Sequence, residues 1–139
     1  DAQESRGLGD VYKRQLDLRA GETVVMIRRL LSMGQTPTVV DDIWLPGTIF
    51  RGLTLELLTA NKAPLYGLFE SEFGVSMVRA DEKLRAVIAP AEVCPLLNVP
   101  AGTPLLQVDR VSYTYGDRPM EIRRGLYLTD RYHYRNSLN

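Results

Sequence analysis

The residues best suited to chemistry in this chain are two arginines on predicted strands. Arg29 shares a strand face with Ile27, and Arg110 shares one with Val108, because side chains two apart along a strand point the same way. Both guanidinium groups are therefore expected to face apolar neighbours. A buried arginine needs an anionic partner, since breaking such a pair costs about 3–5 kcal/mol.

Three further side chains could meet these arginines. Asp41 lies on the predicted strand that follows the one carrying Arg29. Glu121 and Tyr127 are six residues apart and share one face of the last long strand. In one interpretation the two carboxylates form internal salt bridges with Arg29 and Arg110. In the other, all five residues line a pocket that binds an anionic or polar ligand, and the spacing alone leaves both open.

Other kinds of site are excluded by residue type and spacing. No G-x-G-x-x-G or G-K-[ST] pattern is present, so the sequence predicts no nucleotide loop. One histidine and one cysteine cannot supply the clustered ligands of a typical zinc site, and no Ser-His-Asp set stands out. We therefore predict no metal, no cofactor and no catalytic residue. Cys94 lies in an apolar run, which favours a buried structural thiol over a nucleophile.

The composition is that of an ordinary globular domain of 139 residues. Its 17 basic and 17 acidic residues give a formal charge of zero, which provides no electrostatic footprint for nucleic acid or for a membrane surface. No apolar run approaches the roughly 18 residues of a membrane span, and no signal peptide is recognisable. A single cysteine fits a reducing cytoplasm, where we expect the protein to act.

Two stretches of the chain, residues 16–45 and 97–127, are similar to each other. Each is expected to form a helix end, a glycine-containing turn, a strand, a tight turn and a second strand. The tight turns contain Gly34 and Gly116 between β-branched and aromatic runs, which is typical of hairpins. Two copies are too few for a solenoid, so we predict one α+β domain in which two pseudo-repeated hairpins share a sheet. Six residues recur at equivalent places in the later copy: Leu16, Ala20, Gly21, Arg29, Gly34 and Pro37.

The hydrophobic pattern predicts the other elements. The first strand carries apolar residues on both faces, as a central strand does, and Gly74 stops the second helix. We predict, in order, strands at 23–31 and 37–44, helices around 53–58 and 65–73, a strand at 75–89, a short helix at 90–99, the second hairpin, and a short edge strand at 132–135.

The first fifteen residues show no apolar periodicity and no match elsewhere in the chain. The string from Gly7 to Gln15 resembles a translated sequencing adaptor. The first copy of the repeat begins at Leu16, in what should be the last turn of a helix. We therefore predict a non-native or disordered tail at residues 1–15 and an N-terminally truncated ligand-binding domain at residues 16–139.

Several motifs occur in a fixed order from Leu16 to the C-terminus. They are DIWLPG at 42–47 after Gly34 and Pro37, LYGLFE at 65–70, YTYGDRPME at 113–121 and DRY at 130–132. Together they resemble the UTRA domain, the effector-sensing domain of HutC-type regulators in the GntR family. The resemblance implies the chorismate-lyase-like fold: an antiparallel sheet with flanking helices and a small-molecule pocket, usually in a homodimer.

The resemblance also implies a set of ligand contacts. In relatives that sense sugar phosphates, the pocket uses positions that correspond here to Arg29, Asp41, Glu121 and Tyr127. Two departures affect the expected ligand, because Leu31 stands where the second arginine of a pair is usual, and Ala63-Pro64 stands where a small hydroxyl residue opens the helix. Both remove phosphate-binding groups, so the resemblance favours a carboxylate or another small polar metabolite held by Arg29.

The resulting hypothesis is a sensor domain of a bacterial transcriptional repressor. Ligand binding would alter a dimer and so modulate operator binding by a winged helix-turn-helix, which this chain lacks; we expect DNA binding only through that domain. The main alternative is a chorismate-lyase-like enzyme that acts on a small carboxylate. A purely structural dimerisation module is the third possibility. We expect no enzyme, because only Glu121 suggests acid-base work and a binding site uses such a residue equally well.

Overall fold

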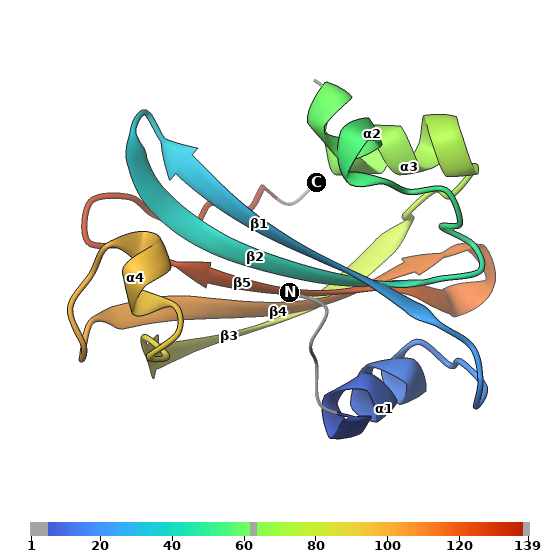
Figure 1. The fold of residues 1–139 in the computed structure, drawn as a ribbon, viewed down its shortest axis with the longest axis horizontal. Helices are drawn as coiled ribbons and strands as arrows, with labels where there is room; N and C mark the ends of the chain where they lie inside the picture. Colours follow the sequence, from blue (N-terminus) through green and yellow to red (C-terminus); the bar gives the residue numbers. More distant parts are fainter. Residues whose placement is uncertain (1–5, 62–63, 138–139) are drawn as a thin grey trace. The chain divides into compact units, whose positions relative to one another are not determined.

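The computed structural model describes residues 6–61 and 64–137 of the chain. Within these residues no helix is long and apolar enough to cross a membrane. The elements, shown in Figure 1, are α1 (Arg6–Gln15), β1 (Val24–Met33), β2 (Thr36–Pro46), α2 (Leu55–Ala60), α3 (Leu65–Phe73), β3 (Arg79–Ile88), α4 (Cys94–Leu97), β4 (Pro104–Thr114), a 3-10 turn (Tyr115–Asp117) and β5 (Arg118–Tyr127).

The five strands form one antiparallel sheet in the order β1-β2-β5-β4-β3. The hairpins β1-β2 and β4-β5 are joined through their second strands, β2 and β5 (Figure 1). Each hairpin turns at a glycine with a positive φ, 62° at Gly34 and 73° at Gly116, which glycine adopts without a steric penalty. The predicted α+β class and the predicted sharing of one sheet by two hairpins are therefore confirmed.

The helix predicted over residues 65–73 is also confirmed, and it ends as expected. Gly74 adopts the left-handed conformation with φ of 67°, and its N–H bonds the carbonyl oxygens of Phe69 and Glu70. Glycine is favoured at this position because it has no Cβ to clash in that conformation.

Three expectations about strands are wrong in detail. β1 is an edge strand and not a central one, because apolar residues on both faces report side-chain surroundings and not the number of neighbouring strands. β3 begins at Arg79, so residues 75–78 lie outside it. Residues 132–135 form an irregular segment after β5, and Tyr134 there makes a side-chain contact instead of a ladder.

The described chain divides into two compact units. Unit 1 takes the described parts of Asp1–Met26, Trp44–Asp81 and Val111–Ile122. Unit 2 takes those of Ile27–Ile43, Glu82–Arg110 and Arg123–Asn139.

Unit 1 packs helices on two opposite strand faces. Ile122 of β5 joins a core cluster with Trp44, on which the ring of Tyr12 from α1 stacks with centroids 4.0 Å apart. The preceding residue, Glu121, points to the other face, because neighbouring side chains alternate along a strand. There Tyr66 of α3 donates a hydrogen bond to it. Helices α1 and α3 therefore cover opposite faces of unit 1.

The segment expected to be a foreign or disordered tail contributes α1 to this packing. Helix α1 runs from Arg6 to Gln15, and the amide of Leu16, a buried residue, bonds the carbonyl of Tyr12. The origin of residues 1–15 concerns the gene, and that part of the expectation stays a prediction.

Unit 2 has one apolar and one charged strand face. The apolar face packs Val40, Leu105 and Leu126 against Leu97 of α4 and its neighbours. Asp41 and Tyr127 follow Val40 and Leu126 by one residue each, so both point to the opposite face. That face carries most of the residues that the sequence identified.

Candidate functional site

Four of the five predicted ligand-binding residues belong to unit 2, and one belongs to unit 1. Arg29, Asp41, Arg110 and Tyr127 are in unit 2, whereas Glu121 is in unit 1. The contacts within each unit are therefore described in turn.

The Arg29–Asp41 ion pair is the first contact in unit 2. Arg29 approaches one carboxylate oxygen, Oδ2, with Nη2 at 2.7 Å and Nε at 3.3 Å. Nη1 of Arg123 lies 3.6 Å from the same oxygen. Asp41 is only 2% exposed, and its other oxygen, Oδ1, is buried without a hydrogen-bond partner among the described residues. A buried acceptor in that state costs about 1–3 kcal/mol, so Oδ1 is a position that a hydrogen-bond donor would stabilise.

Arg110 is held by a carboxylate that the sequence analysis did not identify. Its Nε and Nη2 atoms each lie 2.7 Å from Oε2 of Glu82 on β3. The hydroxyl of Tyr134 donates to the same carboxylate at 2.7 and 2.8 Å. The pairing of Arg29 with Asp41 that the sequence suggested is present, and Glu82 supplies the anion for Arg110.

Tyr127 lies within electrostatic range of both ion pairs. Its ring packs edge-on against Tyr134, with centroids 5.3 Å apart. Burial raises the pKa of Tyr127, and the negative charge of Asp41 raises it further, while Arg123 and Arg110 oppose the rise. The phenol is therefore neutral at physiological pH and can donate one hydrogen bond.

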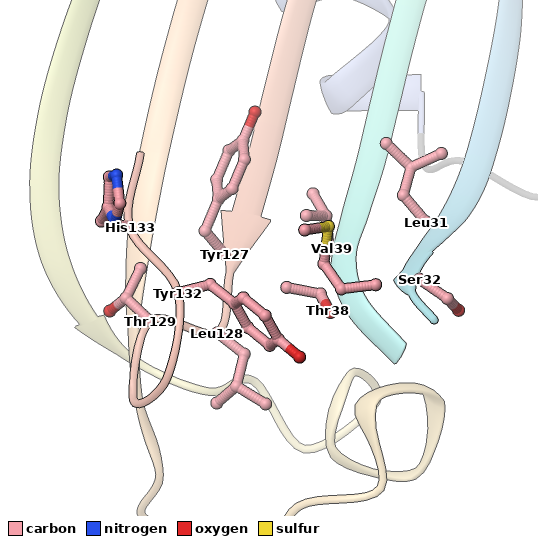
Figure 2. Close-up of a pocket in the computed structure, with 10 residues that line it drawn as sticks. Leu31, Ser32, Thr38, Val39, Tyr127, Leu128, Thr129, Tyr132 and His133 are labelled. Atoms are coloured by element: carbon pink, nitrogen blue, oxygen red, sulfur yellow. The ribbon is translucent and has the colours of Figure 1, made fainter. Parts of the chain in front are cut away.

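The ring of Tyr127 lies over a glycine of its own strand. A Cβ built on Gly125 would lie 2.5 Å from Cε1 of Tyr127 and 3.3 Å from its hydroxyl oxygen. In Figure 2 the hydroxyl of Tyr127 accordingly points back along β5, away from Leu128 and Thr129. Gly125 thus leaves the space in which the phenol is folded against the sheet.

A cavity of about 200 Å³ opens beside Tyr127 in unit 2. Figure 2 shows Leu31 of β1, Thr38 and Val39 of β2 and the ring of Tyr132 around it. The lining is largely apolar, although Ser32, Thr38 and Thr129 contribute hydroxyl groups. Leu31 and Val39 line the cavity, and each is two residues from Arg29 or Asp41 on the same strand; Arg29 and Asp41 themselves are not part of the lining.

Glu121 has its own polar contacts in unit 1. It is fully buried, and its Oε1 accepts hydrogen bonds from Tyr66 at 2.6 Å and from Ser112 at 3.0 Å. These contacts lock the carboxylate between α3 and β4. Through these two hydrogen bonds Glu121 helps to hold α3 against β4 in unit 1.

Metal binding and cysteine chemistry find no support in the part of the chain that the structure describes. No group of three or more His, Cys, Asp or Glu residues there could hold a metal ion. The thiol of Cys94 is partly buried and lies 3.9 Å from the carbonyl oxygens of Ala89 and Pro100.

Sequence reasoning missed several of the residues that build these sites. Arg123 was not among the predicted site residues, yet its side chain is 17% exposed and it lies beside Asp41. Its position two residues after Glu121 on the same strand face is the signal that could have identified it. Glu82, Tyr134 and Tyr66 could not be found, because their partners lie 28 to 55 residues away in sequence.

Comparison with known proteins matches the chain to one domain family and to a solved structure of high sequence identity. The family model described as "UTRA domain" matches residues 9–133. The ligand-binding domain of a putative GntR-family transcriptional regulator from Bordetella bronchiseptica is 81% identical, with a TM-score of 0.86, over 91% of this chain and 80% of that one.

Two curated relatives are transcriptional regulators. The HTH-type transcriptional regulator Rv0792c of Mycobacterium tuberculosis is 30% identical over 80% of this chain and 42% of its own length. The mannosyl-D-glycerate transport/metabolism system repressor MngR of Escherichia coli is 23% identical over 90% of this chain and 51% of its own length. The chain thus spans about half the length of these two relatives, both of which are named as regulators of transcription or repressors.

Proposed function

We propose, because the chain belongs to the UTRA domain family, that it senses a small polar or anionic effector for a bacterial transcriptional regulator. The effector would bind at Arg29 and Asp41 on the charged face of unit 2. The observation that carries this proposal is the buried Oδ1 of Asp41, which has no hydrogen-bond partner among the described residues although the carboxylate is only 2% exposed.

The donors and acceptors at this pair match an anionic effector. Among the described residues, Asp41 takes Nε and Nη2 of Arg29 and leaves Nη1 for a ligand acceptor. The Arg29 side chain is 30% exposed, so a ligand can reach it. An arginine binds carboxylates through charge-assisted hydrogen bonds, which are roughly twice as strong as neutral ones.

A thermal-shift screen of small carboxylates and polar metabolites tests this proposal. A ligand at 100 times its Kd stabilises the folded state by about 2.7 kcal/mol, which is a rise in Tm on the order of 10 °C for a domain of this size. Arg29→Gln should abolish the shift. Arg79→Gln is the matched control, because Arg79 belongs to unit 1 and pairs with Asp81 and Asp117. A shift that survives Arg29→Gln would place the effector elsewhere.

In the complete regulator, effector binding would change affinity for the operator. The DNA would be bound by an N-terminal winged helix-turn-helix, as the HTH-type names of the relatives suggest, and a repressor would release its operator in the cytoplasm. The size of the response equals the difference in effector affinity between the two states of the regulator. Operator binding measured with and without the effector would show no change if the domain only holds the dimer together.

We also propose that the domain forms homodimers through the edge strand β3. Leu84 and Ile88 are 53% and 62% exposed and share one face of this strand, with Ala86 between them. An exposed edge strand with apolar side chains is a ready surface for a second copy of the chain. Leu84→Lys should convert a dimer to a monomer in sedimentation, whereas a dimer that persists would require another interface.

A further inference from the structure

We propose that the effector is a monocarboxylate that carries a neighbouring hydrogen-bond donor and an apolar body about the size of a phenyl ring. This inference rests on the proposed function, since it places the charged end of the ligand at Arg29 and Asp41. It adds the apolar cavity beside Tyr127 as the second part of the same site.

The charged pair sets the polar end of the ligand. Arg29 retains Nη1 for an acceptor, and Asp41 retains Oδ1 for a donor, in the part of the chain that the structure describes. A ligand that satisfies both atoms needs a carboxylate together with a hydroxyl or amino group close to it. A carboxylate alone would leave the Asp41 oxygen buried and unsatisfied, at a cost of about 1–3 kcal/mol.

The cavity sets the other end. Leu31, Val39 and the rings of Tyr127 and Tyr132 form its walls (Figure 2), and a charged group placed among them would lose its hydration. Its volume is about 200 Å³. Benzene occupies an apolar cavity of about 150 Å³, so a phenyl ring or a branched alkyl group of similar size fits here.

The two ends are close enough for one small molecule. Leu31 follows Arg29 by two residues on one face of β1, and Val39 precedes Asp41 by two on β2. Residues two apart on a strand are separated by roughly 7 Å. Tyr127 is close to both parts of the proposed site. It lines the cavity, and the negative charge of Asp41 raises the pKa of its hydroxyl group.

Three small carboxylates test separately the contributions of the carboxylate, the hydroxyl group and the apolar ring. Mandelate carries the carboxylate, the hydroxyl and the phenyl ring; lactate lacks the ring, and phenylacetate lacks the hydroxyl. We expect isothermal titration of the full chain to give the tightest binding for mandelate. Lactate and phenylacetate should each bind about tenfold or more weakly, because each loses one set of contacts worth at least about 1.4 kcal/mol.

A pair of variants on one strand provides the matched control. Leu31→Arg places a charge in the cavity and should weaken mandelate about tenfold or more. Leu30→Arg changes the neighbouring residue, which is exposed to a similar degree (47% against 38%) but does not line the cavity, and should leave the affinity unchanged. Circular dichroism of both variants verifies that they fold.

The outcomes distinguish this inference from the proposed function. Equal affinities for mandelate and lactate, or a mandelate affinity that Leu31→Arg does not change, would overturn the inference. Binding of lactate or inorganic phosphate that requires Arg29 but tolerates Leu31→Arg would also overturn it, while the sensor function would stand. If mandelate binds tightly to the wild-type chain and both Arg29→Gln and Leu31→Arg abolish that binding, the result supports both the proposed function and this inference.

Discussion

The substitution Gly125→Ala tests directly how the phenol of Tyr127 is positioned. The added methyl group would lie 2.5 Å from Cε1 of the Tyr127 ring, so the ring must move. Forcing an extra carbon into a packed site costs about 1–3 kcal/mol. Alanine in place of glycine recovers about 0.4–1 kcal/mol, because the unfolded chain loses entropy. We therefore expect a net loss of roughly 0.5–2 kcal/mol.

A double-mutant cycle isolates this contact. In a Tyr127→Ala background the clash is absent, so Gly125→Ala should be neutral or stabilising there. The coupling energy between the two positions is then about 1–3 kcal/mol, within the range measured for side chains in contact. Urea denaturation of the four proteins provides the free energies of unfolding, and effector titration shows whether the displaced ring also weakens binding. An equal effect of Gly125→Ala in both backgrounds would refute the proposed packing.

Three further predictions concern stability. Tyr66→Phe removes a donor from the fully buried Glu121 and should cost about 1–3 kcal/mol in urea denaturation, and a neutral result would mean that other groups satisfy the carboxylate. Because burial raises the pKa of Tyr127, its contribution to stability is complete below pH ~10 and is lost as the pH rises from there through the folded pKa. Tyr127→Phe should therefore flatten the loss of stability above pH ~10, and an unchanged slope there would contradict this. Tyr12→Ala removes a ring stacked on Trp44 and should cost about 1–3 kcal/mol, whereas no cost is expected if α1 is a foreign tail that does not pack in solution.

The fold was largely accessible from the sequence because its turns carry strong local signals. Gly34 and Gly116 mark two hairpins, and Gly74 ends α3 in the conformation that glycine favours. Local signals do not report which strands become neighbours. The sequence therefore placed β1 in the centre of the sheet, whereas the observed order puts it at an edge.

The site was only partly accessible for the same reason. Arg29 and Asp41 could be paired from the sequence because one hairpin brings them together. Glu82 pairs with Arg110 across 28 positions, and its partner depends on β3 lying next to β4. The cavity beside Tyr127 depends on side chains from β1, β2 and the segment after β5, and no spacing rule places these together.

The most direct test of the central claim is an NMR titration of the isotope-labelled chain with mandelate. Binding at the proposed site should shift the backbone amide signals of Arg29, Leu31, Asp41 and Tyr127 together, with one common dissociation constant. Residues of unit 1 such as Trp44 should change little. Shifts confined to unit 1 would contradict an effector site on the charged face of unit 2, whereas no shifts in a large excess of mandelate would contradict the ligand class inferred for that site.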